Sequence, residues 1–254
     1  MSIVRVQLPG PQRRLTLLEV QLYVSKTDQF PNLPPLPSPP PPSPPPPATV
    51  TVVEQGVSLL EALQQIATPG AAARLELSEG THALATPLRL DASALGGASE
   101  LWLVGSGPGA SLDAPPPATL RHRRLTSSGS TNDGAEDASA ALTVVGDVMV
   151  HVQGLSLRGT DGAATLAASD GATLVLHGCE LRGAHGASAL ALRGNGTHVI
   201  VRNTTFTENQ APEGGGILVR DGALVEVSAS TFKGNRAVHG GALAVFGAGS
   251  RARV

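Results

Sequence analysis

The sequence predicts an all-β fold, a right-handed parallel β-helix with an N-terminal capping helix, preceded by a proline-rich linker and a short β-hairpin remnant. Three observations predict it. The C-terminal half repeats itself every 24 to 26 residues. Within each repeat, apolar residues alternate at a period of two over short segments, as in strands. Only 2% of the residues are aromatic while 41% are hydrophobic, so the core must consist of Leu, Val, Ile and Ala.

The repeats align on rows of apolar residues, and the members of one row are expected to stack inside the solenoid. The rows are Leu157, Leu181, Phe206 and Phe232; Val152, Leu176, Val201 and Val227; Val150, Leu174, Val199 and Val225; and Leu166, Leu190, Ile217 and Leu243. Three short strands per repeat are therefore expected. A lone coil buries too little apolar surface to offset its loss of conformational entropy, so only a stack of coils is stable.

The chain divides into three regions. Residues 31–47 contain 12 prolines, which exclude helix and sheet and favour polyproline II. Residues 29–49 are therefore predicted to be a proline-rich linker, either a passive spacer or a docking segment for an SH3-like partner. Residues 1–28 hold two expected strands around the turn at Pro9, and residues 50–254 form the β-helix.

The two ends of the β-helix differ in sequence. Residues 57–67, VSLLEALQQIA, are expected to form a capping helix with Ser58 as the N-cap. Its apolar face is expected to hold Leu59, Leu60, Leu63 and Ile66. At the other end, Ala252 follows Val225 by 27 residues, so the chain is expected to enter a further coil and to leave the β-helix incomplete at its C-terminus.

Composition argues against several partners. The net charge is −2 and only 15% of the residues are charged, so no basic face is expected for nucleic acid. Cys179 is the single cysteine, which excludes an internal disulfide, and its place in the repeat predicts a buried side chain. The seven histidines do not share a repeat position, and no metal or cofactor site is expected. No apolar run approaches the roughly 20 residues of a membrane span.

Two motif pairs resemble a known family. FTEN (206–209) followed by GGGIL (214–218), and FKGN (232–235) followed by GGAL (240–243), resemble the FxxN and GGA[ILV] repeats of chlamydial polymorphic outer-membrane proteins. More broadly, residues 50–254 look like the pectin-lyase-like β-helix class, including the GTHAL stretch near the capping helix. The resemblance implies a surface-exposed, adhesive protein.

Two further resemblances concern the N-terminal region. The SPPPP blocks are similar to hydroxyproline-rich wall proteins of algae and plants. The stretch VRVQLPGPQRRLTLLEVQLY in residues 1–28 resembles the closing strands of discoidin-like or fucose-lectin-like jelly rolls. Together they imply an extracellular, cell-wall or cell-surface location, although no signal peptide stands in this chain.

The candidate site residues lie mainly in turns. Asn209 and Asn235 are expected to form a ladder, because Asn tolerates the left-handed conformation that a corner needs. The next bend requires positive φ or close approach and is expected at Gly214, Gly215, Gly240 and Gly241. Sequons make Asn195 and Asn203 acceptors for N-glycans in a secreted protein. The acidic stretch 126–139 is either an insertion loop or a calcium ligand set.

The sequence favours a non-catalytic structural or adhesive protein that contacts polysaccharide or other cell-surface or cell-wall components. A polysaccharide lyase or glycoside hydrolase is the first alternative, but the expected outward positions show no stacked pair of aspartates for metal or acid–base work. Carbohydrate binding through a domain upstream of the linker is the second alternative. Fold alone does not decide between them.

Overall fold

The computed structural model describes residues 50–66, 72–116 and 140–254. The expected hairpin of residues 1–28, the linker of residues 29–49 and the acidic stretch 126–139 lie outside the described residues.

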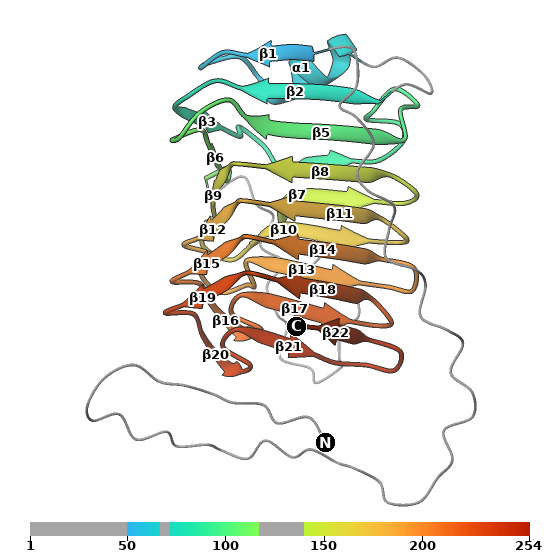
Figure 1. Ribbon diagram of the computed structural model, residues 1–254, viewed down its shortest axis with the longest axis vertical. Coiled ribbons are helices and arrows are strands. Elements are labelled where there is room, and N and C mark those ends of the chain that lie inside the picture. The colour runs from blue at the N-terminus through green and yellow to red at the C-terminus, as the bar shows by residue number, and fades with distance from the viewer. Residues whose placement is uncertain (1–49, 67–71, 117–139) are drawn as a thin grey trace, which may run out of the picture. The chain divides into compact units, whose positions relative to one another are not determined.

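Three parallel sheets form the walls of a solenoid whose coils stack along its long axis (Figure 1). We call them sheets A, B and C. Sheet A, in spatial order, contains β1 (Val50–Val53), β2 (Ala73–Leu77), β5 (Glu100–Gly105), β8 (Met149–Gln153), β11 (Thr173–His177), β14 (His198–Arg202), β18 (Leu224–Ser228) and β22 (Arg251–Arg253). The prediction of a parallel β-helix is therefore confirmed.

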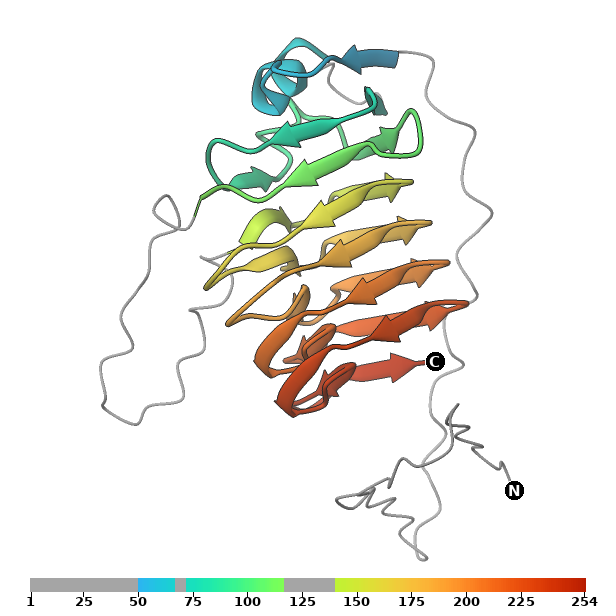
Figure 2. The same cartoon turned by 90° about the vertical axis from the view of Figure 1, so that its left-hand side faces the viewer.

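The other two sheets have six strands each. Sheet B contains β3 (Thr81–Ala83), β6 (Ser111–Asp113), β9 (Ser156–Arg158), β12 (Glu180–Arg182), β15 (Thr205–Thr207) and β19 (Thr231–Lys233). Sheet C contains β4 (Leu88–Leu90), β7 (Ala140–Val145), β10 (Ala164–Ser169), β13 (Leu190–Arg193), β17 (Ile217–Arg220) and β21 (Leu243–Val245). Figure 2 shows the strands of successive coils lying one below another.

The predicted rows are in register. Leu176 pairs with Val152 on one side and with Val201 on the other, and Val201 pairs with Val227. These four side chains are at most 6% exposed. Phe206 pairs with Leu181 and Phe232 in the same way, and the rings of Phe206 and Phe232 stack with centroids 4.8 Å apart. Each row thus forms a continuous apolar ladder inside the solenoid.

Two coils have a fourth strand that the repeat did not predict. β16 (Gln210–Glu213) and β20 (Arg236–His239) pair with each other in a separate two-stranded sheet, between sheets B and C along the chain. Their apolar residues are few, so the period-two pattern that identified the other strands is weak here.

The predicted capping helix is α1 (Leu59–Ile66), at the N-terminal end of the solenoid (Figure 1). Among the side chains that the structure describes in this helix, those of Leu59, Ala62 and Leu63 are buried. The side chain of Ile66, which was also expected on the apolar face, lies outside them. Leu60 is 45% exposed, so the prediction that it faces the core is wrong. The reason is helical geometry, since Leu59, Ala62 and Leu63 are three and four residues apart and Leu60 lies beside that stripe.

Candidate functional site

An asparagine ladder ties three coils together at the corner after sheet B. Asn209 is 0% exposed. Its Oδ1 accepts a hydrogen bond from the Ala184 amide and its Nδ2 donates to the Leu181 carbonyl, both at 3.1 Å. Nδ2 also donates to Oδ1 of Asn235 at 2.9 Å, and Nδ2 of Asn235 donates to the Phe206 carbonyl at 2.9 Å. The amide groups are occupied by the backbone, which gives the ladder a structural role.

The left-handed backbone conformation lies one residue before each asparagine. Glu208 has a φ of 55° and Gly234 a φ of 67°, and neither Asn209 nor Asn235 is among the described residues with positive φ. The expectation that asparagine stands here for its backbone tolerance is therefore wrong. Asparagine serves at this position through its side-chain amide, which donates and accepts hydrogen bonds at the same time.

The glycine pairs make the bend before sheet C. Gly214 and Gly240 have φ values of 55° and 63°, where a side chain is strained. A Cβ on Gly215 would lie 2.6 Å from the Gly241 carbonyl oxygen, and one on Gly241 would lie 3.0 Å from the Asn235 carbonyl oxygen. The first glycine of each pair thus provides the backbone conformation. The second allows close approach of the backbone, between coils at Gly215 and within one coil at Gly241.

The two sequon asparagines are exposed in different turns. Asn195 lies between β13 and β14, and its sequon threonine, Thr197, is 1% exposed. The Thr197 hydroxyl donates to the Arg193 carbonyl at 2.7 Å and accepts from the Gly171 amide at 3.2 Å. Asn203 directly follows β14 with a φ of 49°. Both asparagine side chains are accessible on the folded surface.

The outer face of sheet B carries two in-register rows that are wholly polar from β6 onward. One row is Ser111, Ser156, Glu180, Thr205 and Thr231, and the other is Asp113, Arg158, Arg182, Thr207 and Lys233. The central outer row of sheet C differs, since from β7 onward it consists of Thr143, Ala167, Ala191, Leu218 and Ala244. Because neighbouring strands are about 4.8 Å apart, sheet B presents a regular array of hydrogen-bonding groups on a rigid support.

A groove of about 270 Å³ adjoins this face at the asparagine corner. Its lining includes His185, Glu208, Gln210 and Arg236. Three of them stand on one ladder, because His185 bridges to Gln210 and Gln210 pairs with Arg236. In the described part of the chain, Arg182, Lys233 and Arg236 have no carboxylate within ion-pair distance. The corner can therefore offer donors and positive charge to a ligand.

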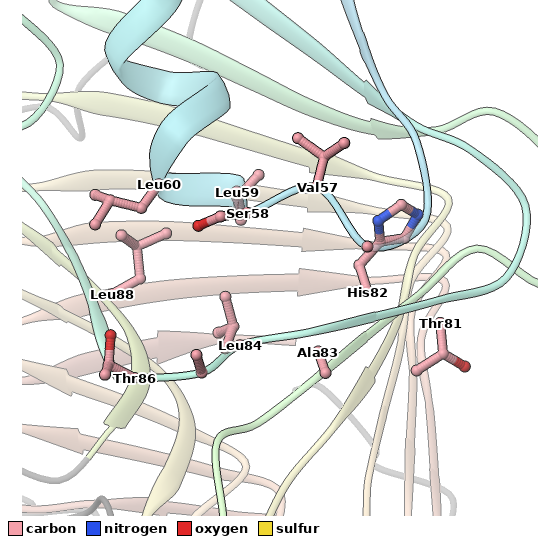
Figure 3. Close-up of a pocket in the computed structure, with 12 residues that line it drawn as sticks. Val57, Ser58, Leu59, Leu60, Thr81, His82, Ala83, Leu84, Thr86 and Leu88 are labelled. Atoms are coloured by element: carbon pink, nitrogen blue, oxygen red, sulfur yellow. The ribbon is translucent and has the colours of Figure 1, made fainter.

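A second candidate site lies at the N-terminal end, in a pocket of about 320 Å³ (Figure 3). Its apolar lining includes Val57, Leu60, Leu84 and Leu88, and its polar lining includes Ser58, Thr81, Thr86 and His82. Figure 3 shows the His82 ring near Val57, and Ser58, Leu60, Leu84 and Leu88 farther along the pocket. The pocket is bounded by the start of α1 and by the β3–β4 segment.

His82 occupies an inward position that the sequence analysis missed. It pairs with Leu112, which pairs with Leu157, so it is the first member of the inward row of sheet B. It is 5% exposed, and its Nε2 donates to the Ser78 carbonyl at 2.9 Å. Aligning the first complete coil with the later ones would have found it, but residues 114–139 between β6 and β7 break the regular spacing.

A buried cluster on the outer face of sheet A joins three side chains. The rings of Trp102 and His151 stack with centroids 3.9 Å apart. Trp102 Nε1 donates to Glu100 Oε1 at 2.9 Å, and His151 Nε2 lies 3.1 Å from the same oxygen. Burial lowers the pKa of His151, although the Glu100 carboxylate opposes this shift. The cluster is enclosed and is better suited to stability than to catalysis.

Cys179 is buried, as its place in the repeat predicted. Its Sγ contacts the Val152 carbonyl at 3.3 Å, and burial raises the pKa of the thiol. A thiol of raised pKa is a poor nucleophile. Across residues 50–66, 72–116 and 140–254, no group of three or more His, Cys, Asp or Glu side chains is arranged to hold a metal ion.

No protein-family model matches the chain, and no curated protein matches it. Within the part of the chain that the structure describes, no helix has the length and apolarity to cross a membrane.

Proposed function

We propose that this protein is a non-catalytic structural or adhesive β-helix of the cell surface or cell wall, and that it contacts polysaccharide through the outer face of sheet B and the adjoining corner groove. The repeat resemblance to polymorphic outer-membrane proteins and the SPPPP blocks of the linker support a surface location. The observation that carries the proposal is the pair of in-register polar rows on sheet B. One row includes Arg182 and Lys233, which have no carboxylate within ion-pair distance among the residues that the structure describes.

The physical argument is one of spacing and rigidity. A polysaccharide chain presents hydroxyl groups at regular intervals, and a strand ladder presents donors and acceptors at regular intervals of about 4.8 Å. Since the strands are fixed by ladder hydrogen bonds, little backbone entropy is lost on binding, and the cost is that of ordering the long side chains, about 1 kcal/mol each. Many weak contacts along one chain then add up to useful retention.

The test is retention of the full chain on insoluble polysaccharides, using cellulose, pectin and chitin. A double variant, Arg182→Gln with Lys233→Gln, should lower retention on the polysaccharide that binds, by roughly tenfold per lost charged hydrogen bond. Arg89→Gln with Arg253→Gln is the matched control, because it removes the same charge from sheets C and A. Retention on none of the three, or equal loss in both double variants, would contradict the proposal.

A second candidate function, polysaccharide cleavage, is favoured by one observation. Glu208 lies in the same groove as His185 and Arg236, and a carboxylate beside an imidazole and a guanidinium is a combination that acid–base chemistry uses. If this is the function, the protein should release soluble fragments from the polysaccharide that it retains. Glu208→Gln should abolish that release while lowering retention far less than the Arg182→Gln and Lys233→Gln double variant does.

A further inference from the structure

The corner between sheets A and B contains a groove of about 390 Å³ that extends over four coils. Its lining includes Gly154, Gly178 and Asn203, each of which directly follows a strand of sheet A and so occupies the same position in successive coils. All three have positive φ, of 64°, 62° and 49° respectively. A Cβ on Gly178 would meet no atom within 4 Å. The two glycines therefore leave the groove open, and Asn203 stands at its C-terminal end.

The side chain of Asn203 differs from that of the ladder residue Asn209. It is exposed, and its amide makes no side-chain hydrogen bond with the residues that the structure describes, whereas the amide of Asn209 is bonded to two neighbouring coils. Asparagine tolerates the left-handed conformation. That conformation does not require asparagine here, because two earlier coils have glycine at this position and the next coil has Ala229 with a φ of 48°.

Asn203 is also the first residue of the sequon Asn203-Thr204-Thr205. In a secreted protein this sequence is the acceptor for an N-linked glycan. Thr205, the sequon hydroxyl residue, is half-buried on the outer face of sheet B and lines the same groove. The amide that would be modified is therefore accessible in the folded protein, at one end of an open groove.

The groove offers groups that suit the first sugar of such a glycan, an N-acetylhexosamine. Ser156, Glu180 and Thr205 line it on the side of sheet B. A carboxylate accepts hydrogen bonds and a hydroxyl both donates and accepts them, so these side chains can pair with sugar hydroxyls and with the acetamido N–H. A volume of about 390 Å³ is at the lower end of the range for small-molecule sites, which is enough for one sugar unit.

We propose that Asn203 carries an N-linked glycan and that the first sugar of this glycan lies in the groove between sheets A and B. In the transfer, Nδ2 of Asn203 forms a bond to C1 of a lipid diphosphate-linked oligosaccharide. The bond from C1 to the diphosphate oxygen breaks, the lipid diphosphate leaves, and the amide gives up one proton. The inference rests on the surface location given under the proposed function, but not on the polysaccharide contact. The row that contains Arg182 and Lys233 stays open beside the glycan.

The experiment is secretion of the full chain, behind an added signal peptide, from human cells that make only high-mannose glycans. Mass spectrometry should find a glycan on the peptide that contains Asn203, and Thr205→Val should abolish it while leaving Asn203 in place. Endoglycosidase trimming to a single sugar should leave the melting temperature unchanged. Thr205→Val should lower it by about 2 to 4 °C relative to the same pair of proteins made in bacteria without glycans. Asn195→Gln, at the sequon between β13 and β14, is the matched control and should leave it unchanged.

Three results would overturn the proposal. In the first, the Asn203 peptide is unmodified although a marker glycoprotein secreted by the same cells is modified. In the second, the protein trimmed to one sugar melts at the same temperature as Thr205→Val, so the first sugar does not pack in the groove. In the third, Asn195→Gln lowers the melting temperature as much as Thr205→Val does. Each result is obtained without polysaccharide, so it is separate from any failure of the proposed polysaccharide contact.

Discussion

The C-terminal coils, from β11 to β21, and the N-terminal coils, from β2 to β8, have the same architecture but different regularity. In the C-terminal coils the inward row of sheet B is Leu181, Phe206 and Phe232, without interruption. In the N-terminal coils that row begins with His82, and a Trp102–His151 stack lies on the outer face of sheet A. The comparison teaches that the N-terminal departures from the repeat bury imidazole rings, whereas the C-terminal coils bury the asparagine of the repeat itself.

The largest expected effect comes from placing a histidine in the regular part of the row. Leu181→His buries an imidazole without a partner and removes a fully buried leucine, so it should lower the free energy of unfolding by about 4 kcal/mol. Arg182→His, one residue on and facing outward, should change it by less than about 0.5 kcal/mol. Urea unfolding followed by circular dichroism measures both. Equal effects would mean that the row is less tightly packed than its register implies.

Substitutions in the asparagine ladder of the C-terminal coils should have the next largest effect on the free energy of unfolding. Asn209→Ala leaves the Ala184 amide and the Leu181 carbonyl without their side-chain partner in a buried place, and should cost about 2 to 3 kcal/mol. Asn235→Ala affects a half-buried side chain and should cost about 1 kcal/mol. The same unfolding measurement ranks the two. A larger loss of stability for Asn235→Ala than for Asn209→Ala would show that Asn235 contributes more to the asparagine ladder.

The His151 cluster should make stability depend on pH. Because burial lowers its folded pKa, the unfolded state binds the proton more readily below an ordinary histidine pKa of about 6.5. The contribution of His151 to the free energy of unfolding should therefore be fully present above about pH 7. It should be lost as the pH falls below about 6.5, with a slope of less than about 1.4 kcal/mol per pH unit. His151→Gln should reduce this slope. His198, whose pKa burial also lowers, accounts for part of what remains, and an unchanged slope would exclude His151.

The smallest effect is expected for the reverse exchange at the N-terminal end. His82→Leu removes an Nδ1 that has no partner but also removes the hydrogen bond to Ser78. The two changes nearly cancel, so stability should change by less than about 1 kcal/mol. Thermal unfolding of the full chain provides the measurement. A loss as large as that of Leu181→His would show that His82 is a structural residue and would remove the distinction between the two regions.

Much of the fold was predictable, and for one reason. A strand alternates its side chains between two faces, so a period of two that recurs in each coil specifies both the strands and their stacking. The positions of Val152, Leu176, Val201 and Val227 follow from this directly. The strands β16 and β20 carry little of that pattern and were missed.

The candidate sites were predictable only in part. Asn209 and Asn235 were found by their spacing, but the left-handed residue is their predecessor, Glu208 or Gly234. Leu60 was predicted on the buried side of α1 but is exposed. Each step of one residue turns the side chain by about 100° around the helix, so a neighbour of a buried residue can face solvent. His82 was not singled out, since a single histidine in a strand carries no sign of which face it occupies unless its coil is aligned.

The sequence by itself determined the repeat, the inward rows and the glycine bends, because these depend on local periodicity and on backbone conformations that few residues adopt. Only the tertiary structure decided which polar groups of different coils come together. Glu208 lines one groove with His185 at the corner, and His82 lines one pocket with the start of α1. The members of each pair are more than about 20 positions apart in the sequence, and the stacking of the coils, rather than local propensity, brings them together.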